Sequence, residues 1–207
     1  KHTGGLSSFG IGLTVQRKLA KKIGKDRELA QALWATDNYD AKVLGLLIDD
    51  PKKVTVEQAE QQVEQLNAGM LTHVFSSCDA TLAKSPVAFE VAQKWLASDD
   101  HTRRSCGFGL VYEFSKKKSK LYTDDFFSSV IDDIASHFDN EPKSIKLAMG
   151  GALMGIGKRN VELNQKALAL AEKLGPIDFN EDGQKCDPFD VAKHLKSDYL
   201  KEKLGLS

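Results

Sequence analysis

Apolar residues recur at steps of three and four positions in almost every segment of this chain, whereas the alternation typical of β-strands is nearly absent. This periodicity predicts an all-α protein. Short polar breaks such as Asp50-Pro51 and Ser98-Asp99-Asp100 separate the periodic segments. The expected helices cover roughly residues 14–23, 27–34, 40–48, 56–66, 71–83, 87–96, 102–115, 124–138, 143–156, 161–174 and 188–204.

One pattern occurs three times: a short acidic or polar turn, then a basic residue, then a run of small and apolar residues. The copies are Ala35–Gly45, Ala97–Gly107 and Asp139–Gly150. The turn supplies a helix cap, and the small residues let the following helix pack closely on a neighbour. A weaker copy lies between the first two, with His73 about midway between Lys42 and Arg104 in place of the cation.

Helix pairs with a period of about 30 to 40 residues predict a HEAT-like solenoid, because each pair buries its apolar face only against the next pair. We expect residues 1–207 to form a single α-helical HEAT-like repeat domain, with residues 176–207 as a C-terminal capping segment. Stacking would bring Lys42, Arg104 and Lys146 to one edge. A concave basic face of this kind suits a polyanion.

Composition narrows the functional classes. A chain of 207 residues with 41% hydrophobic content can bury a core. Lys plus Arg equals Asp plus Glu at 29 each, so nucleic-acid affinity would need segregated charges. No signal peptide or long apolar stretch is present, which argues against a membrane partner. The first residue is Lys1 and not Met, which is consistent with a leading segment.

The cysteines Cys78, Cys106 and Cys186 are odd in number and widely spaced. This spacing favours a reducing cytoplasm and gives no zinc site, so we expect no metal and no cofactor. We expect a monomer. The string 178–184 resembles the start of a calcium loop, but Phe189 stands where a bidentate Glu is required, so an ordinary turn is predicted.

Cations at helix starts are the candidate nucleic-acid ligands, because they can act together with free backbone N–H groups on phosphates. An equally good interpretation of each is a solvated surface charge with an ion-pair partner. Helical glycines, among them Gly107 and Gly150, indicate close helix packing or close approach of a ligand. The predicted nucleic-acid-binding residues are Lys42, Arg103, Arg104, Lys143, Lys146, Lys158 and Arg159, joined by Arg17, Lys18, Lys21 and Lys22 on the first helix.

Several strings together resemble the HEAT-like-repeat DNA alkylation repair proteins, the AlkD type of alkylpurine DNA glycosylase. The resemblance covers nearly the whole chain. The strings that carry it are Phe9-Gly10-Ile11-Gly12, Leu33-Trp34, Trp95-Leu96-Ala97-Ser98-Asp99, Arg103-Arg104, Ile156-Gly157-Lys158-Arg159-Asn160, Leu163-Asn164 and the tail 182–190. The resemblance implies binding of duplex DNA and release of a cationic N3- or N7-alkylated purine, assisted by a carboxylate and aromatic faces.

The family's Trp-Asp-x-x-Asp pattern is not kept here. An ungapped match places Phe75 where the catalytic Asp belongs, whereas a match shifted by about one helical turn keeps an aromatic at Phe75 and an aspartate at Asp79. Phe75 is then the base-stacking candidate and Asp79 the catalytic candidate. The family's later Trp falls near Gly151, and Arg104 matches its arginine. Two functions stay open: a glycosylase, and a noncatalytic scaffold that binds DNA structures or a protein partner.

Overall fold

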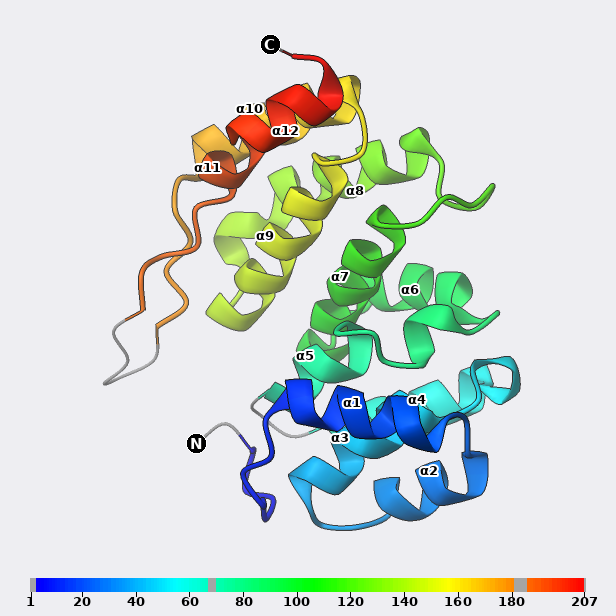
Figure 1. The fold of residues 1–207 in the computed structure, drawn as a ribbon. Helices are drawn as coiled ribbons and strands as arrows, with labels where there is room; N and C mark the ends of the chain where they lie inside the picture. The colour runs from blue at the N-terminus through cyan, green and yellow to red at the C-terminus, as the bar shows by residue number, and fades with distance from the viewer. Residues whose placement is uncertain (1–2, 67–69, 181–185, 207) are drawn as a thin grey trace. The chain divides into compact units, whose positions relative to one another are not determined.

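The computed structural model describes residues 3–66, 70–180 and 186–206. Within these ranges every regular element is a helix, and the β-type pairings are two isolated bridges, Ser7 with Asn38 and Ile177 with Phe189. The predicted all-α class is therefore confirmed (Figure 1). None of the helices in the described ranges is long and apolar enough to cross a membrane.

The chain divides into two compact units, residues 1–110 and 111–207, and helix α7 (His101–Ser115) contributes to both. Whether the two units form the expected single domain depends on how they join, so the single domain stays a prediction. Unit 1 also contains α1 (Leu13–Ile23), α2 (Arg27–Trp34), α3 (Tyr39–Ile48), η1 (Pro51–Lys53), α4 (Val56–Glu64), α5 (Met70–Ser76), η2 (Leu82–Lys84) and α6 (Ala88–Leu96). Unit 2 contains α8 (Asp124–His137), η3 (Phe138–Asn140), α9 (Lys143–Ile156), α10 (Val161–Leu174), α11 (Val191–Leu195) and α12 (Asp198–Leu204).

Side-chain caps begin the repeat helices of unit 1. The Asn38 amide oxygen accepts from the backbone N–H of Ala41 at 3.0 Å, and an Asp100 carboxylate oxygen accepts from that of Arg103 at 2.8 Å. These bonds satisfy donors that the first turn of a helix leaves unpaired, as the repeat pattern predicts. The third repeat helix, α9, begins after Pro142 without a side-chain cap.

A row of three aromatic rings forms the core of unit 1. Phe75 lies between Trp34 and Trp95, with ring centroids 6.2 and 6.0 Å away. Each indole N–H also has an acceptor: Trp34 donates to Gln65 at 2.8 Å and Trp95 to Glu60 at 3.0 Å. Because buried indoles need such partners, the row fixes where α2, α5 and α6 meet.

Unit 2 is organised by α10, which packs against α8, α9 and α11. Ile134 of α8 and Met149 of α9 are fully buried there. Helices α11 and α12 follow an antiparallel bridge between Ile177 and Phe189, and the capping role of residues 176–207 stays a prediction. An added Cβ at Gly150 would lie 2.5 Å from the Ile177 side chain and 3.1 Å from the Phe189 ring, so this glycine lets the segment lie directly on α9.

The helix predicted over 71–83 ends early. Helix α5 stops at Ser76, and Cys78 and Asp79 have positive φ angles of 59° and 68°. Two interactions, one local and one with a distant residue, act together. The Ser77 hydroxyl bonds back to the His73 carbonyl, which competes with the helical ladder. The Thr81 N–H donates to the Leu46 carbonyl at 2.9 Å, which draws the chain toward α3.

The helix predicted over 188–204 is divided into α11 and α12. The Asn164 amide donates to the Leu195 carbonyl at 3.5 Å, and in a continuous helix this carbonyl would accept from Tyr199. The buried Asn164 thus takes over an acceptor that the helix would need. The chain restarts at Ser197, which has extended backbone angles.

Two helical glycines give opposite predictions for the same substitution. In α3 an added Cβ at Gly45 would lie 2.8 Å from the Ala30 carbonyl oxygen, whereas at Gly151 in α9 it would meet nothing within 4 Å. We expect Gly45→Ala to lower the free energy of unfolding by about 1–3 kcal/mol through overpacking. Gly151→Ala should raise it by up to about 1 kcal/mol through helix propensity. Urea unfolding followed by circular dichroism measures both, and equal effects would contradict the packing described for Gly45.

Candidate functional site

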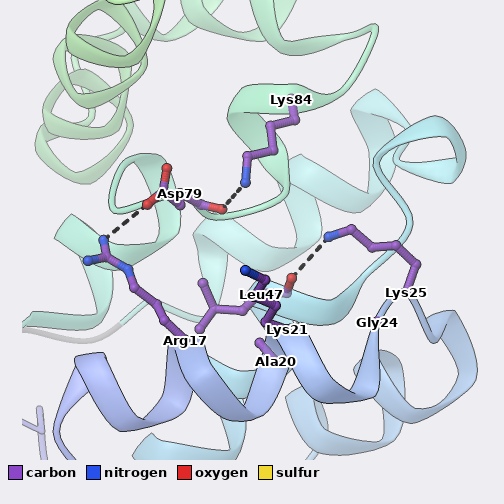
Figure 2. Close-up of a pocket in the computed structure, with 8 residues that line it drawn as sticks. All are labelled: Arg17, Ala20, Lys21, Gly24, Lys25, Leu47, Asp79 and Lys84. Atoms are coloured by element: carbon purple, nitrogen blue, oxygen red, sulfur yellow. Dashed lines mark hydrogen bonds and ion pairs between the residues drawn. The ribbon is translucent and has the colours of Figure 1, made fainter.

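A cavity of about 310 Å³ opens in unit 1 beside the C-terminal half of α1. Helix α1 supplies one wall, α3 supplies the floor at Leu47, and the turn after α5 supplies the opposite wall (Figure 2). The lining residues are Arg17, Ala20, Lys21, Gly24, Lys25, Leu47, Asp79 and Lys84. Four of these are cationic and one is anionic, so the cavity has an excess of three positive charges.

Backbone carbonyls hold three of the four cations in place. The Arg17 guanidinium donates to the Cys78 carbonyl at 2.9 Å, and the Lys84 ammonium donates to the Asp79 carbonyl at 2.6 Å. The Lys25 ammonium donates to the Leu47 carbonyl at 3.0 Å. A carbonyl carries only a partial negative charge, so these bonds orient the cations without neutralising them.

The turn that carries Asp79 is built around these cations. Cys78 and Asp79 both adopt the left-handed conformation, which residues other than glycine seldom adopt. The carbonyls of the same two residues accept from Arg17 and Lys84. The cavity's cations therefore stabilise a backbone conformation that the local sequence disfavours.

Asp79 supplies the cavity's single carboxylate. Its oxygen lies 3.5 Å from the Arg17 guanidinium, and its side chain is 61% exposed (Figure 2). An exposed ion pair of this kind contributes at most about 1 kcal/mol. The carboxylate therefore occupies an anion position from which another anion can displace it.

Burial and charges of both signs act on Lys25. Burial, and then the neighbouring charge of Lys84, hold the pKa of Lys25 below its usual value, whereas the charges of Asp49 and Asp50 oppose this shift. Helix α1 carries two more exposed cations, Lys18 and Lys22, in addition to Arg17 and Lys21, which line the cavity.

The repeated cation of each copy has a structural partner. Lys42 donates to the Trp34 carbonyl at 2.6 Å, Arg104 donates to the Leu96 carbonyl, and Lys146 donates to the Asp139 carbonyl at 3.1 Å. The acceptors of Lys42 and Arg104 lie eight residues earlier, at the last residues of α2 and α6, and the acceptor of Lys146 lies seven residues earlier, within η3. Each cation thus caps one helix from the first turn of the next.

These capping cations also lie over aromatic rings and are mostly withdrawn from solvent. Lys42 is 7% exposed with its ammonium 4.6 Å from the Trp34 ring centroid, and Arg104 is 8% exposed and 5.4 Å from the Phe108 centroid. Burial lowers the pKa of Lys42. We expected Lys42 and Arg104 to contact phosphates. Their charged ends instead lie inside unit 1, where they donate to helix carbonyls.

Arg159 has a similar placement in unit 2. Its guanidinium donates to the carbonyls of Ser115, Lys117 and Tyr122 at 2.9, 3.0 and 3.4 Å, and lies 4.3 Å from the Phe127 ring centroid. Burial lowers its pKa. Arg159 therefore secures the loop between α7 and α8, and its expected phosphate contact stays a prediction.

Arg103 is placed among carboxylates. It forms ion pairs with Glu60, Glu64 and Asp100, and the bond to Glu60 measures 3.0 Å. Hydrogen bonding to Glu64 raises the pKa of Arg103. This arrangement matches the alternative interpretation from the sequence, a surface charge with ion-pair partners.

Two of the expected cations lie at the surface of unit 2. Lys143 pairs with Asp178 at 2.9 Å, and this pairing, together with hydrogen bonds from Asn180, lowers the pKa of Asp178 to about 2. Lys158 is half-buried, and burial followed by the charge of Lys203 lowers its pKa. Their phosphate contacts stay predictions. The string 178–184 extends beyond residue 180, and residues 181–185 lie outside the described residues.

Phe75 and Asp79 are not brought together. Phe75 has no exposed surface, since its ring lies between Trp34 and Trp95 in the core. This differs from the expected base-stacking role, because a buried ring has no face to offer a base. Asp79, by contrast, reaches the cavity.

Sequence reasoning missed Lys25 and Lys84. Lys25 lies in the short break between α1 and α2, and Lys84 is the last residue of η2. Neither belongs to the repeat pattern that drew attention to the other cations. The sequence around Lys25 and Lys84 indicates their role only weakly. Lys25 follows Gly24, whose φ of 82° turns the chain at the end of α1, and Lys84 follows the unexpected turn at Asp79.

The capping role of the repeat cations predicts a contrast between two lysines. We expect Lys42→Met to lower the free energy of unfolding by about 1–3 kcal/mol, because the Trp34 carbonyl loses a charged donor. Lys143→Met removes an exposed ion pair and should cost less than about 1 kcal/mol. Urea unfolding of both variants provides the test. A Lys42→Met variant as stable as the unmodified protein would contradict the capping role.

Comparison with known proteins agrees with this architecture. A family model described as DNA alkylation repair enzyme matches residues 2–178. The uncharacterized proteins Lin0241 of Listeria innocua and Lmo0209 of Listeria monocytogenes are each 24% identical over 200 residues, which cover 92% of this chain and 83% of each relative.

A solved structure is similar over 96% of this chain and 84% of its own, with 26% identity and a TM-score of 0.82. It is described as "A new family of proteins related to the HEAT-like repeat DNA glycosylases with affinity for branched DNA structures". This similarity confirms the HEAT-like repeat fold that the helix periodicity predicts. Since the family model spans most of its length, the chain belongs to the DNA alkylation repair enzyme family.

Proposed function

We propose that this chain binds DNA through the cationic cavity and the outer side of α1, and that it does not excise bases. The observation that carries the proposal is the charge of the cavity, four cations around one displaceable carboxylate. A phosphate satisfies such a site, and the adjacent exposed cations of α1 would continue the contact along the backbone.

Membership of the family and the similar structure support DNA as the ligand. That neighbour is described as having affinity for branched DNA structures. Because this chain is electrically neutral overall, its DNA affinity must come from a local excess of positive charge. The cavity and α1 provide such an excess.

The same charges argue against a glycosylase pocket. An alkylated purine is itself cationic, and the four cations that line the cavity would repel it. None of the described residues that line the cavity is aromatic, so no lining ring can stack on a base. Asp79 is best placed as an internal counter-anion that holds the cations until a phosphate replaces it.

The counter-anion role predicts that removing the charge of Asp79 strengthens DNA binding. We expect Asp79→Asn to tighten DNA binding several-fold, because the competing carboxylate charge is removed from the phosphate position. Lys21→Gln should weaken binding and reduce the slope of log K against log salt by about 1. Fluorescence anisotropy with a labelled duplex and a labelled four-way junction, at several NaCl concentrations, measures affinity and slope.

Lys196→Gln is the matched control for the charge change, because Lys196 lies in unit 2 and pairs with Glu172. It should leave affinity and slope nearly unchanged. Binding that is weak and insensitive to salt in the unmodified protein would overturn the proposal and favour a protein partner. Weaker binding by Asp79→Asn would overturn the counter-anion role.

The second candidate function, base release, has its own test. We expect no release of 7-methylguanine or 3-methyladenine above the rate in buffer when excess protein is incubated with methylated duplex DNA in a single turnover. Asp79→Asn should behave identically. Release by the unmodified protein that disappears in Asp79→Asn would instead establish a glycosylase with Asp79 as its catalytic carboxylate.

A further inference from the structure

Phe9 projects its ring into solvent from a tightly held loop. The residue is 77% exposed, the highest value among the large apolar residues that the structure describes as exposed. It precedes α1 in a segment without regular secondary structure. Scattered exposed apolar residues are ordinary, so exposure alone assigns no role to Phe9.

What distinguishes Phe9 is the way its backbone is fixed. The buried Asp40 carboxylate, 4% exposed, accepts from the Phe9 N–H at 2.6 Å and from the Ser8 hydroxyl at 2.7 Å. Its other oxygen accepts from the Ile11 N–H at 3.2 Å and the Gln16 amide at 3.1 Å. Four bonds to one carboxylate fix the loop on both sides of the ring and tie it to α1 and α3.

The N-terminal side of the loop is fixed as well. The Ser7 N–H donates to the Asp37 carbonyl at 3.1 Å, and the Tyr39 N–H donates to the Ser7 carbonyl at 2.8 Å. In Figure 1 this segment runs beside the start of α3. The loop is therefore anchored on both sides, and the Phe9 ring is directed outward. A flexible loop, by contrast, could fold an apolar ring against the protein.

The surroundings of the loop indicate what the ring contacts. The loop leads directly into α1, whose exposed side carries Arg17, Lys18, Lys21 and Lys22. An exposed apolar ring in a loop that leads into a helix with exposed cations is a combination suited to nucleic acids with unstacked bases, because the cations hold phosphates while the ring stacks on a base. In an intact duplex the bases already stack on each other, whereas a branch point presents bases that lack a neighbour.

Resting on the proposed DNA binding, we infer that Phe9 stacks on an unpaired or unstacked base at a branch point, with Asp40 as the residue that positions it. The ring thereby selects branched DNA over duplex, while the cations supply affinity for both. Phe9 takes the stacking role that the buried Phe75 cannot perform.

The test compares a three-way junction that carries unpaired bases at its branch point with a duplex of the same sequence. Phe9→Ala should lose about tenfold in affinity for the junction, within the range of one base–aromatic stack, and keep its duplex affinity and salt slope. Phe9→Trp should restore the preference. Tyr199→Ala, which removes a ring that is 75% exposed in unit 2, is the matched control and should change neither affinity.

A spectroscopic measurement separates stacking from a structural effect. With 2-aminopurine as the unpaired base, stacking on Phe9 should quench its fluorescence, and Phe9→Ala should abolish the quenching. Asp40→Asn should lose the quenching too, although the ring is present, because an amide cannot accept all four hydrogen bonds. Thermal melting checks that each variant is folded.

Two outcomes overturn the proposals separately. Unchanged quenching and junction preference in Phe9→Ala, with salt-dependent binding intact, would remove the stacking role and leave the proposed DNA binding standing. Binding of neither DNA by the unmodified protein would overturn the DNA-binding proposal, and the role of Phe9 with it.

Discussion

Helices α2 and α6 end at carbonyls that accept from cations reaching back across a turn. The last carbonyls of a helix have no intrahelical donors. Where two helices meet in a short turn, water cannot easily reach these carbonyls to donate hydrogen bonds. Lys42 and Arg104 solve this for α2 and α6 by donating to the last or final-turn carbonyls of those helices. An ammonium or guanidinium at this position also opposes the negative end of the helix dipole.

This constraint decides which charges remain for function. Lys42 and Arg104 are buried, lie close to aromatic rings and donate to backbone oxygens, so their charge is directed at helix ends and not at solvent. A neutral chain can present positive charge to a ligand where its cations stay exposed. Helix α1 and the cavity beside it are such a place, since all four cations that line the cavity are exposed.

The sequence predicted the helices well, because apolar periodicity and polar breaks are local properties. Helices α2, α9 and α10 begin and end where expected. The repeat pattern also corresponds to helices in the structure. Its cation, however, was interpreted from charge alone, and charge does not reveal whether a lysine faces a phosphate or a carbonyl eight residues earlier. The break after Ser76 was missed because its cause includes the bond from Thr81 to Leu46 of α3, a contact that no local window contains.

The end of α5 at Ser76 also bears on how the family's catalytic pattern applies to this chain. The shifted match keeps an aromatic and an aspartate four residues apart, which on a continuous helix would place Phe75 and Asp79 on one face. The helix ends between them, so the two side chains diverge: Phe75 packs between two tryptophans, and Asp79 pairs with Arg17 at the surface. The chain keeps the two residue types but not the helical turn between them. The Phe75 ring and the Asp79 carboxylate are therefore not neighbours. The geometry that remains at Asp79 is that of a carboxylate among cations, which suits the binding of phosphate better than the stabilisation of a cationic sugar.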